Sequence, residues 1–178
     1  LWPDGTIPYE IDPDLPNQKR VTDAVAHWND MTPVKLVPRT GESAYVKFVK
    51  GTGCSSFVGR IGREQRINLA DGCNTGATIH EIGHAAGLYH EQSRQDRDFH
   101  VRINYSNIDK ESVSNFNQEL INSEDVGSYD FGSIMHYGVL DFSRNNRPVI
   151  ESMPAGIPIR QRSSLSAADI EAVHKLYG

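Results

Sequence analysis

The sequence predicts an α+β fold of two lobes, in which a mixed sheet and a long helix form the first lobe and loops dominate the second. Residues 17–31 carry apolar side chains at helical spacing, and short β-rich runs follow at 34–37 and 45–49. Residues 127–162 are rich in Gly, Pro and Ser, which is typical of loops. Regular structure is therefore expected mainly in the first half of the chain, with one further helix at its close.

Local patterns describe the helix at 17–31 further and place three other elements. The helix at 17–31 has its apolar stripe on Val21, Val25, Trp28 and Met31. Residues 66–70 alternate polar and apolar side chains, which predicts a half-exposed strand of a twisted sheet. A central helix is expected over 75–88, and another over 107–118 that opens at Asp109.

The last residues predict a helix with defined ends. Ser166 and Asp169 have the spacing of a capping box, in which each side chain bonds the backbone N–H of the other residue. The buried stripe of this helix is expected on three residues: Ile170, Val173 and Leu176. Gly178 is suited to ending the helix, which we place in the second, irregular lobe.

Size and charge restrict the class of protein. A length of 178 residues and a mean hydropathy of −0.50 indicate one globular domain, residues 1–178, which we expect to be monomeric. Its lobes are expected at about 1–90 and 91–178. The net charge of −5 and the pI near 5.8 argue against nucleic acid or anionic lipid as the main partner. No apolar run approaches the roughly 18 residues of a membrane span.

The chain has two cysteines, Cys54 and Cys73. An even number favours one disulfide in a protein from an oxidising compartment. Its loop of about 20 residues would stabilise the fold by roughly 3 kcal/mol through loss of unfolded-state entropy. Two free thiols in a cytosolic protein are the alternative.

The most informative stretch is residues 80–90, which read H-E-x-x-H-x-x-G-x-x-H. Histidines four apart lie on one face of a helix, about 5–6 Å apart at Cβ, so His80 and His84 can reach the same metal ion. Gly87 can take positive φ and end the helix, so that the chain turns back and presents His90 as a third ligand. Three neutral ligands with an open position are typical of catalytic zinc.

Glu81 follows the first of these histidines. Its carboxylate can reach a water at the metal and act as general base. A core helix with incidental histidines is the alternative, but it would bury the charge of Glu81 without a partner. About 45 residues downstream, Met135 lies in the segment Ser133-Ile-Met-His-Tyr-Gly138. A long zinc motif followed by such a Met-turn is typical of metzincin peptidases, in which the methionine is an apolar floor under the ligands.

These two motifs together resemble the astacin family of zinc endopeptidases. The likeness extends from Leu1 to Gly178 and includes further segments, namely Gly5–Tyr9, Gly59-Arg60, Gln65–Leu69, His90–Arg94 and Leu176–Gly178. It implies a metzincin-type catalytic domain with one zinc ion, protein or peptide substrates, secretion, and synthesis as a zymogen with an N-terminal pro-segment. The first residues lack the apolar stretch of a signal peptide, so we expect a mature form without its targeting segment and pro-segment.

The resemblance also implies residue roles. Tyr137 matches a tyrosine that is an extra zinc ligand in the family, leaves the metal when substrate binds, and then stabilises the oxyanion. A phenol can do both, and a buried core tyrosine is the alternative. Glu91 matches a glutamate that pairs with the mature N-terminus, but Leu1 lies several residues inside the usual start. Two other roles are open for Glu91. It can support His90 as an outer-shell carboxylate, or it can form a plain surface salt bridge.

Substrate preference can be inferred from one segment. Residues 160–163 resemble a stretch in meprin-like and tolloid-like members, where an arginine favours an acidic residue directly after the scissile bond. Arg162 matches it, and a guanidinium can pair bidentately with Asp or Glu. A solvated arginine is the alternative.

Two points separate this chain from the family pattern or from other functions. Animal astacins have a second disulfide that this chain lacks, which predicts a compact, single-domain form, and a bacterial source fits it. The competing function is a catalytically inactive zinc-binding recognition module, which needs the three histidines but not Glu81. The presence of Glu81, Met135 and Tyr137 together favours the peptidase.

Overall fold

The computed structural model describes every residue from 1 to 178, and these residues divide into two units. Residues 1–88 and 162–178 form the first, which we call the sheet unit, and residues 89–161 form the second, the loop unit. The mixed α+β character predicted from the sequence is confirmed.

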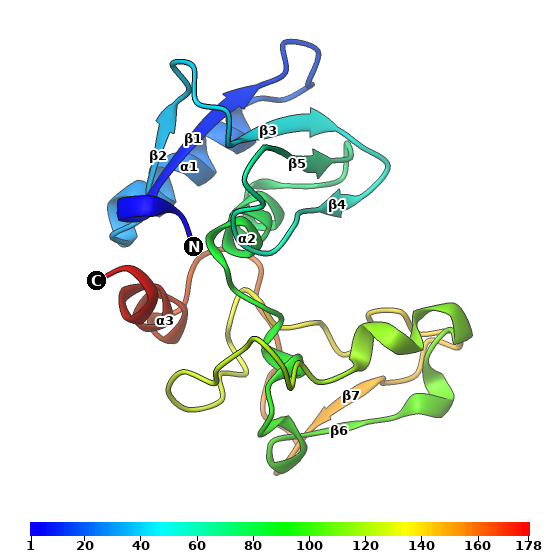
Figure 1. Cartoon of the computed structure of the whole chain (residues 1–178). Helices are drawn as coiled ribbons and strands as arrows, with labels where there is room; N and C mark the ends of the chain where they lie inside the picture. The colour runs from blue at the N-terminus through cyan, green and yellow to red at the C-terminus, as the bar shows by residue number, and fades with distance from the viewer. The chain divides into compact units, whose positions relative to one another are not determined.

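The sheet unit is built on five strands in the spatial order β2-β1-β3-β5-β4 (Figure 1). Their bounds are β1 (Thr6–Ile11), β2 (Lys35–Pro38), β3 (Tyr45–Lys50), β4 (Cys54–Ser55) and β5 (Glu64–Leu69). The first four neighbours in this order pair in parallel, and the short edge strand β4 runs antiparallel to β5. β3 lies in the middle of the sheet, and its four apolar or aromatic residues Tyr45, Val46, Phe48 and Val49 are buried, whereas Lys47 and Lys50 are not.

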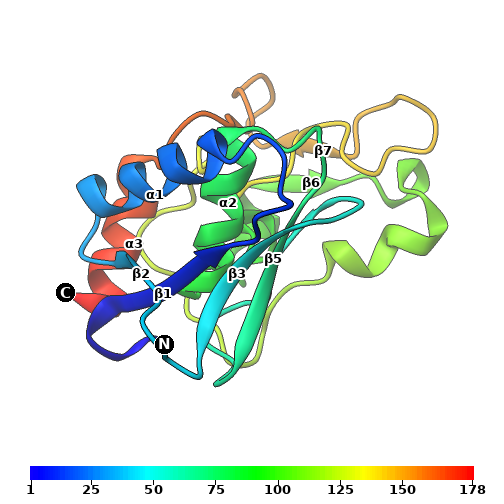
Figure 2. The ribbon, with the colours of Figure 1, turned by 90° about the horizontal axis from the view of Figure 1, so that it is seen from above.

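Two helices, α1 (Lys19–Met31) and α2 (Thr75–Ala86), cover one face of this sheet (Figure 2). The stripe expected on α1 is buried at Val21, Val25 and Trp28, but Met31 at the end of the helix is exposed. The Trp28 indole N–H donates to the carbonyl of Ile79 in α2 at 3.0 Å. Ten of the twelve residues of α2 are buried, so this helix is a central element of the core rather than a surface helix. Its buried polar residues therefore need a structural or chemical reason.

The last helix, α3 (Ala167–Tyr177), has the predicted capping box between Ser166 and Asp169. It belongs to the sheet unit and not to the second lobe, where it was expected from its place in the sequence. The reason lies in polar contacts that the sequence does not reveal. The Leu165 N–H donates to Nε2 of His27 at 3.1 Å, and the Tyr177 hydroxyl donates to the carbonyl of Ala86 at 2.6 Å.

The loop unit contains little regular structure. Its two strands, β6 (Val101–Ile103) and β7 (Ile150–Ser152), pair antiparallel. The remaining elements are 3-10 helices at Glu91–Ser93, Arg97–Phe99, Tyr105–Asn107 and Lys110–Phe116, and a fifth short one, Pro3–Gly5, opens the sheet unit. Six buried residues form the apolar core of the loop unit: Val101, Ile108, Phe116, Tyr129, Val149 and Ile150.

The helix expected at 107–118 is a 3-10 helix over Lys110–Phe116, so that prediction was wrong in type. Asp109 precedes it but makes no side-chain cap. Serine, valine and asparagine, which fill positions 112–115, are poor helix formers because they lose rotamer freedom or bond nearby backbone groups. The segment therefore closes with tighter bonds, such as that from Asn117 N–H to the Ser114 carbonyl.

A buried arginine holds the irregular segments of the loop unit together. Arg97 is 4% exposed, and its guanidinium donates to the carbonyls of Gln92 and Phe116. It also donates to the Tyr105 hydroxyl and to the Asp98 carboxylate. Side-chain donors thus satisfy carbonyls that a helix or sheet would satisfy within the backbone.

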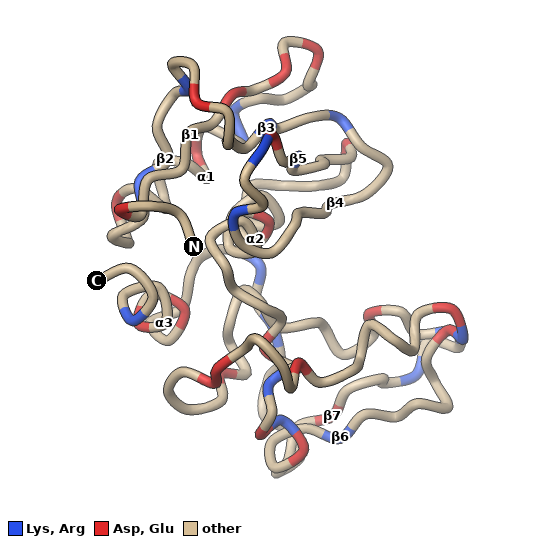
Figure 3. The backbone as a smooth tube through the Cα atoms, in the orientation of Figure 1, with Lys and Arg blue, Asp and Glu red and all other residues tan.

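Charges of both signs are interspersed along both units (Figure 3). The helices are all shorter or more polar than a helix that could cross a bilayer.

Candidate active site

The first two histidines of the motif lie on α2, the helix that the sequence predicted, which we call the zinc helix. The Asn74 side chain caps its start by accepting the Ala77 N–H at 2.9 Å. The rings of His80 and His84 lie on one face with their centroids 4.6 Å apart. Both side chains are buried, so water competes little for their ring nitrogens.

Gly87 ends the helix in the left-handed conformation, with φ at 112°. The bonds from Gly87 N–H to the His84 carbonyl and from Leu88 N–H to the Gly83 carbonyl form a Schellman motif. The Leu88 carbonyl then lies 2.8 Å from Nδ1 of His84. That ring nitrogen is the donor, because a carbonyl can only accept, so Nε2 of His84 is left with its lone pair for a metal ion.

His80, His84 and His90 form a group whose ligand nitrogens all lie within 4.8 Å of one another. Two further observations fit a metal ion held there. Burial lowers the pKa of His84 to about 4, with Arg162 acting in the same direction and the Leu88 carbonyl opposing it, so the imidazole is neutral as a ligand must be. Oε2 of Glu81 is buried without a hydrogen-bond partner, as expected of a carboxylate that interacts with a ligand or substrate.

Glu81 is 4% exposed on the zinc helix. Burial raises the pKa of its carboxyl to about 7, and the positive charge of Arg162 opposes that rise. A carboxyl with a pKa near neutrality can both accept and return a proton at physiological pH.

Arg162 is held against the first turn of α2. A Cβ added at Gly76 would lie 1.7 Å from the Arg162 carbonyl oxygen and 2.6 Å from its carbonyl carbon. The backbone of residue 162 therefore passes over the helix where only glycine leaves room. The charge of Arg162 also acts to lower the pKa values of Glu81 and His84.

In the loop unit, the Met-turn is bonded to the residues that follow His90. Met135 is 2% exposed, and its carbonyl accepts the Glu91 N–H at 3.2 Å. The Tyr137 N–H donates to Oε1 of the fully buried Gln92 at 3.0 Å. The rings of His90 and Tyr137 lie 4.4 Å apart between centroids. The third histidine and the predicted tyrosine are thus brought together.

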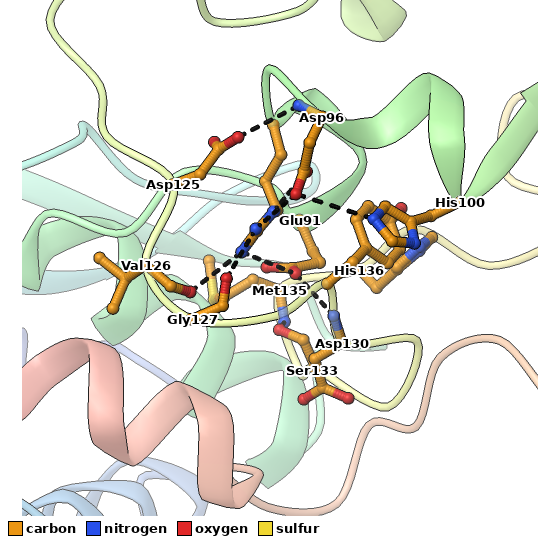
Figure 4. A network of polar contacts seen from close by, with 12 residues as sticks. Glu91, Asp96, His100, Asp125, Val126, Gly127, Asp130, Ser133, Met135 and His136 are labelled. Atoms are coloured by element: carbon orange, nitrogen blue, oxygen red, sulfur yellow. Dashed lines mark hydrogen bonds and ion pairs between the residues drawn. The ribbon is translucent and has the colours of Figure 1, made fainter.

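Glu91 belongs to a polar network within the loop unit (Figure 4). Its Oε1 accepts the Asp130 N–H at 2.8 Å and lies 3.5 Å from Nη1 of Arg94. The Arg94 guanidinium also pairs with Asp96 and donates to the carbonyls of residues 126 and 127. Glu91 is therefore part of a half-buried ion-pair network.

His136 forms a second polar link beside Tyr137. Its Nε2 lies 2.7 Å from the Tyr129 hydroxyl, and its Nδ1 lies 2.7 Å from the Tyr137 carbonyl. Burial raises the pKa of the Tyr129 phenol, so it remains a neutral hydrogen-bonding group. The Met-turn is thus bonded to Gln92 through the Tyr137 N–H and to Tyr129 through the His136 ring.

The predicted disulfide between Cys54 and Cys73 is confirmed. It links the edge strand β4 to the residue before the Asn74 cap of the zinc helix.

Several supporting residues were missed from sequence. Gln92, Gly76 and the Leu88 carbonyl have no periodic pattern, and each acts through backbone geometry that appears only in the fold. The one usable signal was Gln92, a polar residue two positions after the third histidine.

A three-histidine group on a helix and the turn that follows it, in a mixed α+β fold, defines a zinc domain of the metzincin type. The chain belongs to the astacin family of peptidases, since the family model described as Astacin matches residues 1–178. Zinc is accordingly its cofactor.

Named relatives agree with this assignment. The chain is 38% identical to zinc metalloproteinase nas-13 of Caenorhabditis elegans, over 99% of the chain and 40% of that protein. It is 41% identical to blastula protease 10 of Paracentrotus lividus, over 99% of the chain and 32% of that protein. The chain thus spans about a third to two fifths of these relatives.

A solved structure confirms the fold. High choriolytic enzyme 1, a hatching enzyme zinc-protease from the medaka Oryzias latipes, matches with a TM-score of 0.91 and 36% identity. The match covers 99% of this chain and 92% of that one.

Proposed function

We propose that this chain is a secreted zinc-dependent endopeptidase that hydrolyses internal peptide bonds of proteins and peptides. The observation that carries the proposal is the unpartnered, buried carboxylate oxygen of Glu81, one residue after the first histidine of the zinc group. A recognition module that only binds zinc has no use for such a group. A bound zinc ion supplies Lewis-acid polarisation and brings the pKa of a water to about 7.

Glu81 acts as general base and then as general acid. Its carboxylate takes a proton from the attacking water while the water oxygen bonds to the scissile carbonyl carbon. The same proton then passes to the leaving amine nitrogen as the C–N bond breaks, which restores the carboxylate. Burial raises the pKa of this carboxyl, which favours its holding the proton between the two steps.

Tyr137 is assigned as an additional zinc ligand and as the donor that stabilises the oxyanion. Its ring lies beside that of His90, and Gln92 fixes its backbone. Met135, buried in the same turn, is assigned as the apolar floor under the ligands. Glu91 supports the turn after His90 through Asp130 and Arg94.

Arg162 is assigned as the residue that favours Asp or Glu directly after the scissile bond. Its charge acts on Glu81, so a substrate side chain bonded to it would lie near the catalytic carboxyl. Gly76 allows this placement of its backbone.

Secretion is supported by the disulfide and by the absence of free cysteines. We further propose that residues 1–178 act as a single, monomeric catalytic domain. Its substrates are proteins and peptides rather than nucleic acid, and an N-terminal pro-segment holds the precursor inactive.

The test is a mass-spectrometric cleavage profile of zinc-loaded protein on a peptide library. We expect internal cuts that disappear in Glu81→Ala, and enrichment of Asp and Glu after the cut that disappears in Arg162→Gln. Glu171→Ala, on the exposed side of α3, is the matched control and should cleave normally. Zinc-loaded protein that makes no cuts, or cuts that persist in Glu81→Ala, would contradict the proposal and favour the recognition module.

A further inference from the structure

Every carbonyl in the last turn of the zinc helix has a hydrogen-bond donor. The Gly83 and His84 carbonyls accept from the backbone of Leu88 and Gly87, and His84 accepts a second bond from Gly59 N–H at 2.8 Å. These bonds are local or come from the adjoining loop. The last carbonyls of a helix ordinarily depend on such caps or on water.

The final two carbonyls are satisfied differently, by side chains far away in the sequence. The Trp2 indole N–H donates to the Ala85 carbonyl at 2.8 Å, and the Tyr177 hydroxyl donates to the Ala86 carbonyl at 2.6 Å. Trp2 is 3% exposed, and its backbone N–H lies 3.4 Å from the Tyr177 hydroxyl. Both ends of the described chain therefore meet at the end of α2 (Figure 1).

This end of the helix directly precedes the metal-binding turn. After Ala86 the chain passes through Gly87 to Leu88, whose carbonyl orients the His84 ring at Nδ1. His90, the third histidine of the zinc group, follows two residues later. Three peptide bonds connect Ala85 to Leu88. A shift of the Ala85 and Ala86 carbonyls therefore also moves the Leu88 carbonyl.

We propose that Trp2 and Tyr177 are positioning residues for the zinc centre, because they fix the peptide units from which the His84–His90 turn departs. Their donors hold the Ala85 and Ala86 carbonyls along the helix axis, so the turn leaves the helix in one direction. Without them these carbonyls would tilt toward water and the last turn would fray. The inference rests on the zinc site, and its test measures metal binding, so its failure is distinguishable from a failure of the peptidase proposal.

The chain offers a matched control in Trp28. Its indole N–H also donates to a carbonyl of α2, that of Ile79, and it is also fully buried. Ile79 precedes His80 but lies inside the helix, where the intrahelical bond to its carbonyl remains when the indole donor is lost. Trp28→Phe therefore removes the same kind of donor from the same helix without loosening its last turn.

The experiment compares Trp2→Phe, Tyr177→Phe and Trp28→Phe in the full chain. The zinc dissociation constant is measured by chelator competition, the visible spectrum is recorded after Co(II) substitution, and stability is measured in urea. We expect zinc to bind about ten-fold or more weakly in Trp2→Phe and Tyr177→Phe, as for other residues that orient metal ligands. The Co(II) spectrum should change in both, and Trp28→Phe should keep wild-type zinc affinity and spectrum despite lower stability.

The opposite pattern would overturn the inference. If Trp2→Phe and Tyr177→Phe lose stability while their zinc affinity and Co(II) spectra remain those of the wild type, the two residues are structural only. Tyr177→Phe removes a single oxygen atom, so it decides the question if Trp2→Phe does not fold.

Discussion

The sheet unit and the loop unit hold their proposed site residues by different means. His80, Glu81 and His84 lie in the interior of a buried helix, where the backbone groups are hydrogen-bonded within the helix. Tyr137 and Glu91 lie on irregular backbone, where buried side chains such as Gln92 and Arg97 take over the hydrogen bonding. Because every buried backbone group needs a partner, a unit with little helix or sheet must bury polar side chains to supply them.

The largest loss of stability is expected at Arg97, because the loop unit depends most on the hydrogen bonds of this buried side chain. Arg97→Met keeps much of the side-chain volume but leaves the Gln92 and Phe116 carbonyls without donors. Each buried acceptor left unpaired costs about 1–3 kcal/mol, so the free energy of unfolding should fall by about 2–6 kcal/mol. Urea unfolding measures it.

Arg102→Met is the control for Arg97. Arg102 lies on β6 and pairs with Glu151, but its side chain is 65% exposed, so its loss should cost about 0–1 kcal/mol. Equal losses in the two variants would show that the loop unit does not depend on its buried arginine.

The sheet unit should instead be sensitive to close backbone packing. Gly76→Ala would normally favour a helix, but here the new methyl group would lie 1.7 Å from the Arg162 carbonyl oxygen. We expect a loss of about 1–3 kcal/mol from overpacking, together with a weaker preference for acidic residues after the cut, as Arg162 is displaced. Gly72→Ala, where nothing lies within 4 Å, should leave both stability and preference unchanged. If Gly76→Ala were more stable than the wild type, the backbone at residue 162 would have to move away from the helix at little cost.

Gln92 tests the link between the loop unit and catalysis. Gln92→Met removes the hydrogen bond from the Tyr137 N–H to Gln92 and should cost about 1 kcal/mol of stability. If Tyr137 stabilises the oxyanion, kcat should fall while KM changes little, because the interaction is made in the transition state. Gln95→Met, on an exposed side chain of the same unit, is the comparison. A rise in KM with unchanged kcat would assign Gln92 to substrate binding instead.

The smallest effect is a pH dependence in the sheet unit. Burial lowers the pKa of His27 below 6.5, with Asp30 opposing it, and its Nε2 accepts the Leu165 N–H. The native state therefore binds this proton less readily than the unfolded state. The stabilisation from neutral His27 is complete above pH 6.5 and is lost as pH falls from there through the folded pKa.

His27→Gln should flatten that pH dependence, since an amide oxygen can accept the same bond without titrating. Unfolding in urea at pH 7.5 and at pH 5.5 would measure it. An unchanged difference between the two pH values would assign the effect to another group.

The same contrast between units explains what could be predicted from sequence. In the sheet unit, α1, β3 and α2 each have a periodic pattern, and the capping box at Ser166 and Asp169 lies where its spacing indicates. The zinc group was visible because its three histidines lie within eleven residues, where helix geometry relates His80 to His84 and the turn at Gly87 brings in His90.

The features that could not be predicted depend on contacts between residues distant in sequence. The helix expected over 107–118 is a 3-10 helix at Lys110–Phe116, and that expectation gave the opening at Asp109 more weight than the poor helix formers at 112–115. No pattern linked Trp2 or Tyr177 to the end of α2, and none assigned α3 to the sheet unit. Hydrogen bonds from single side chains to distant carbonyls have no period, so they become visible only in the folded chain.

The most direct test of the proposed mechanism measures zinc content and peptide turnover in the same samples of wild type and Glu81→Gln. We predict one zinc ion per chain in both, because the three histidines are unchanged, and turnover lower by a factor of about 10²–10⁴ in the variant. Wild-type turnover in Glu81→Gln would contradict the assignment of Glu81 as the catalytic base. Loss of zinc from that variant would show that Glu81 helps to hold the metal rather than to move the proton.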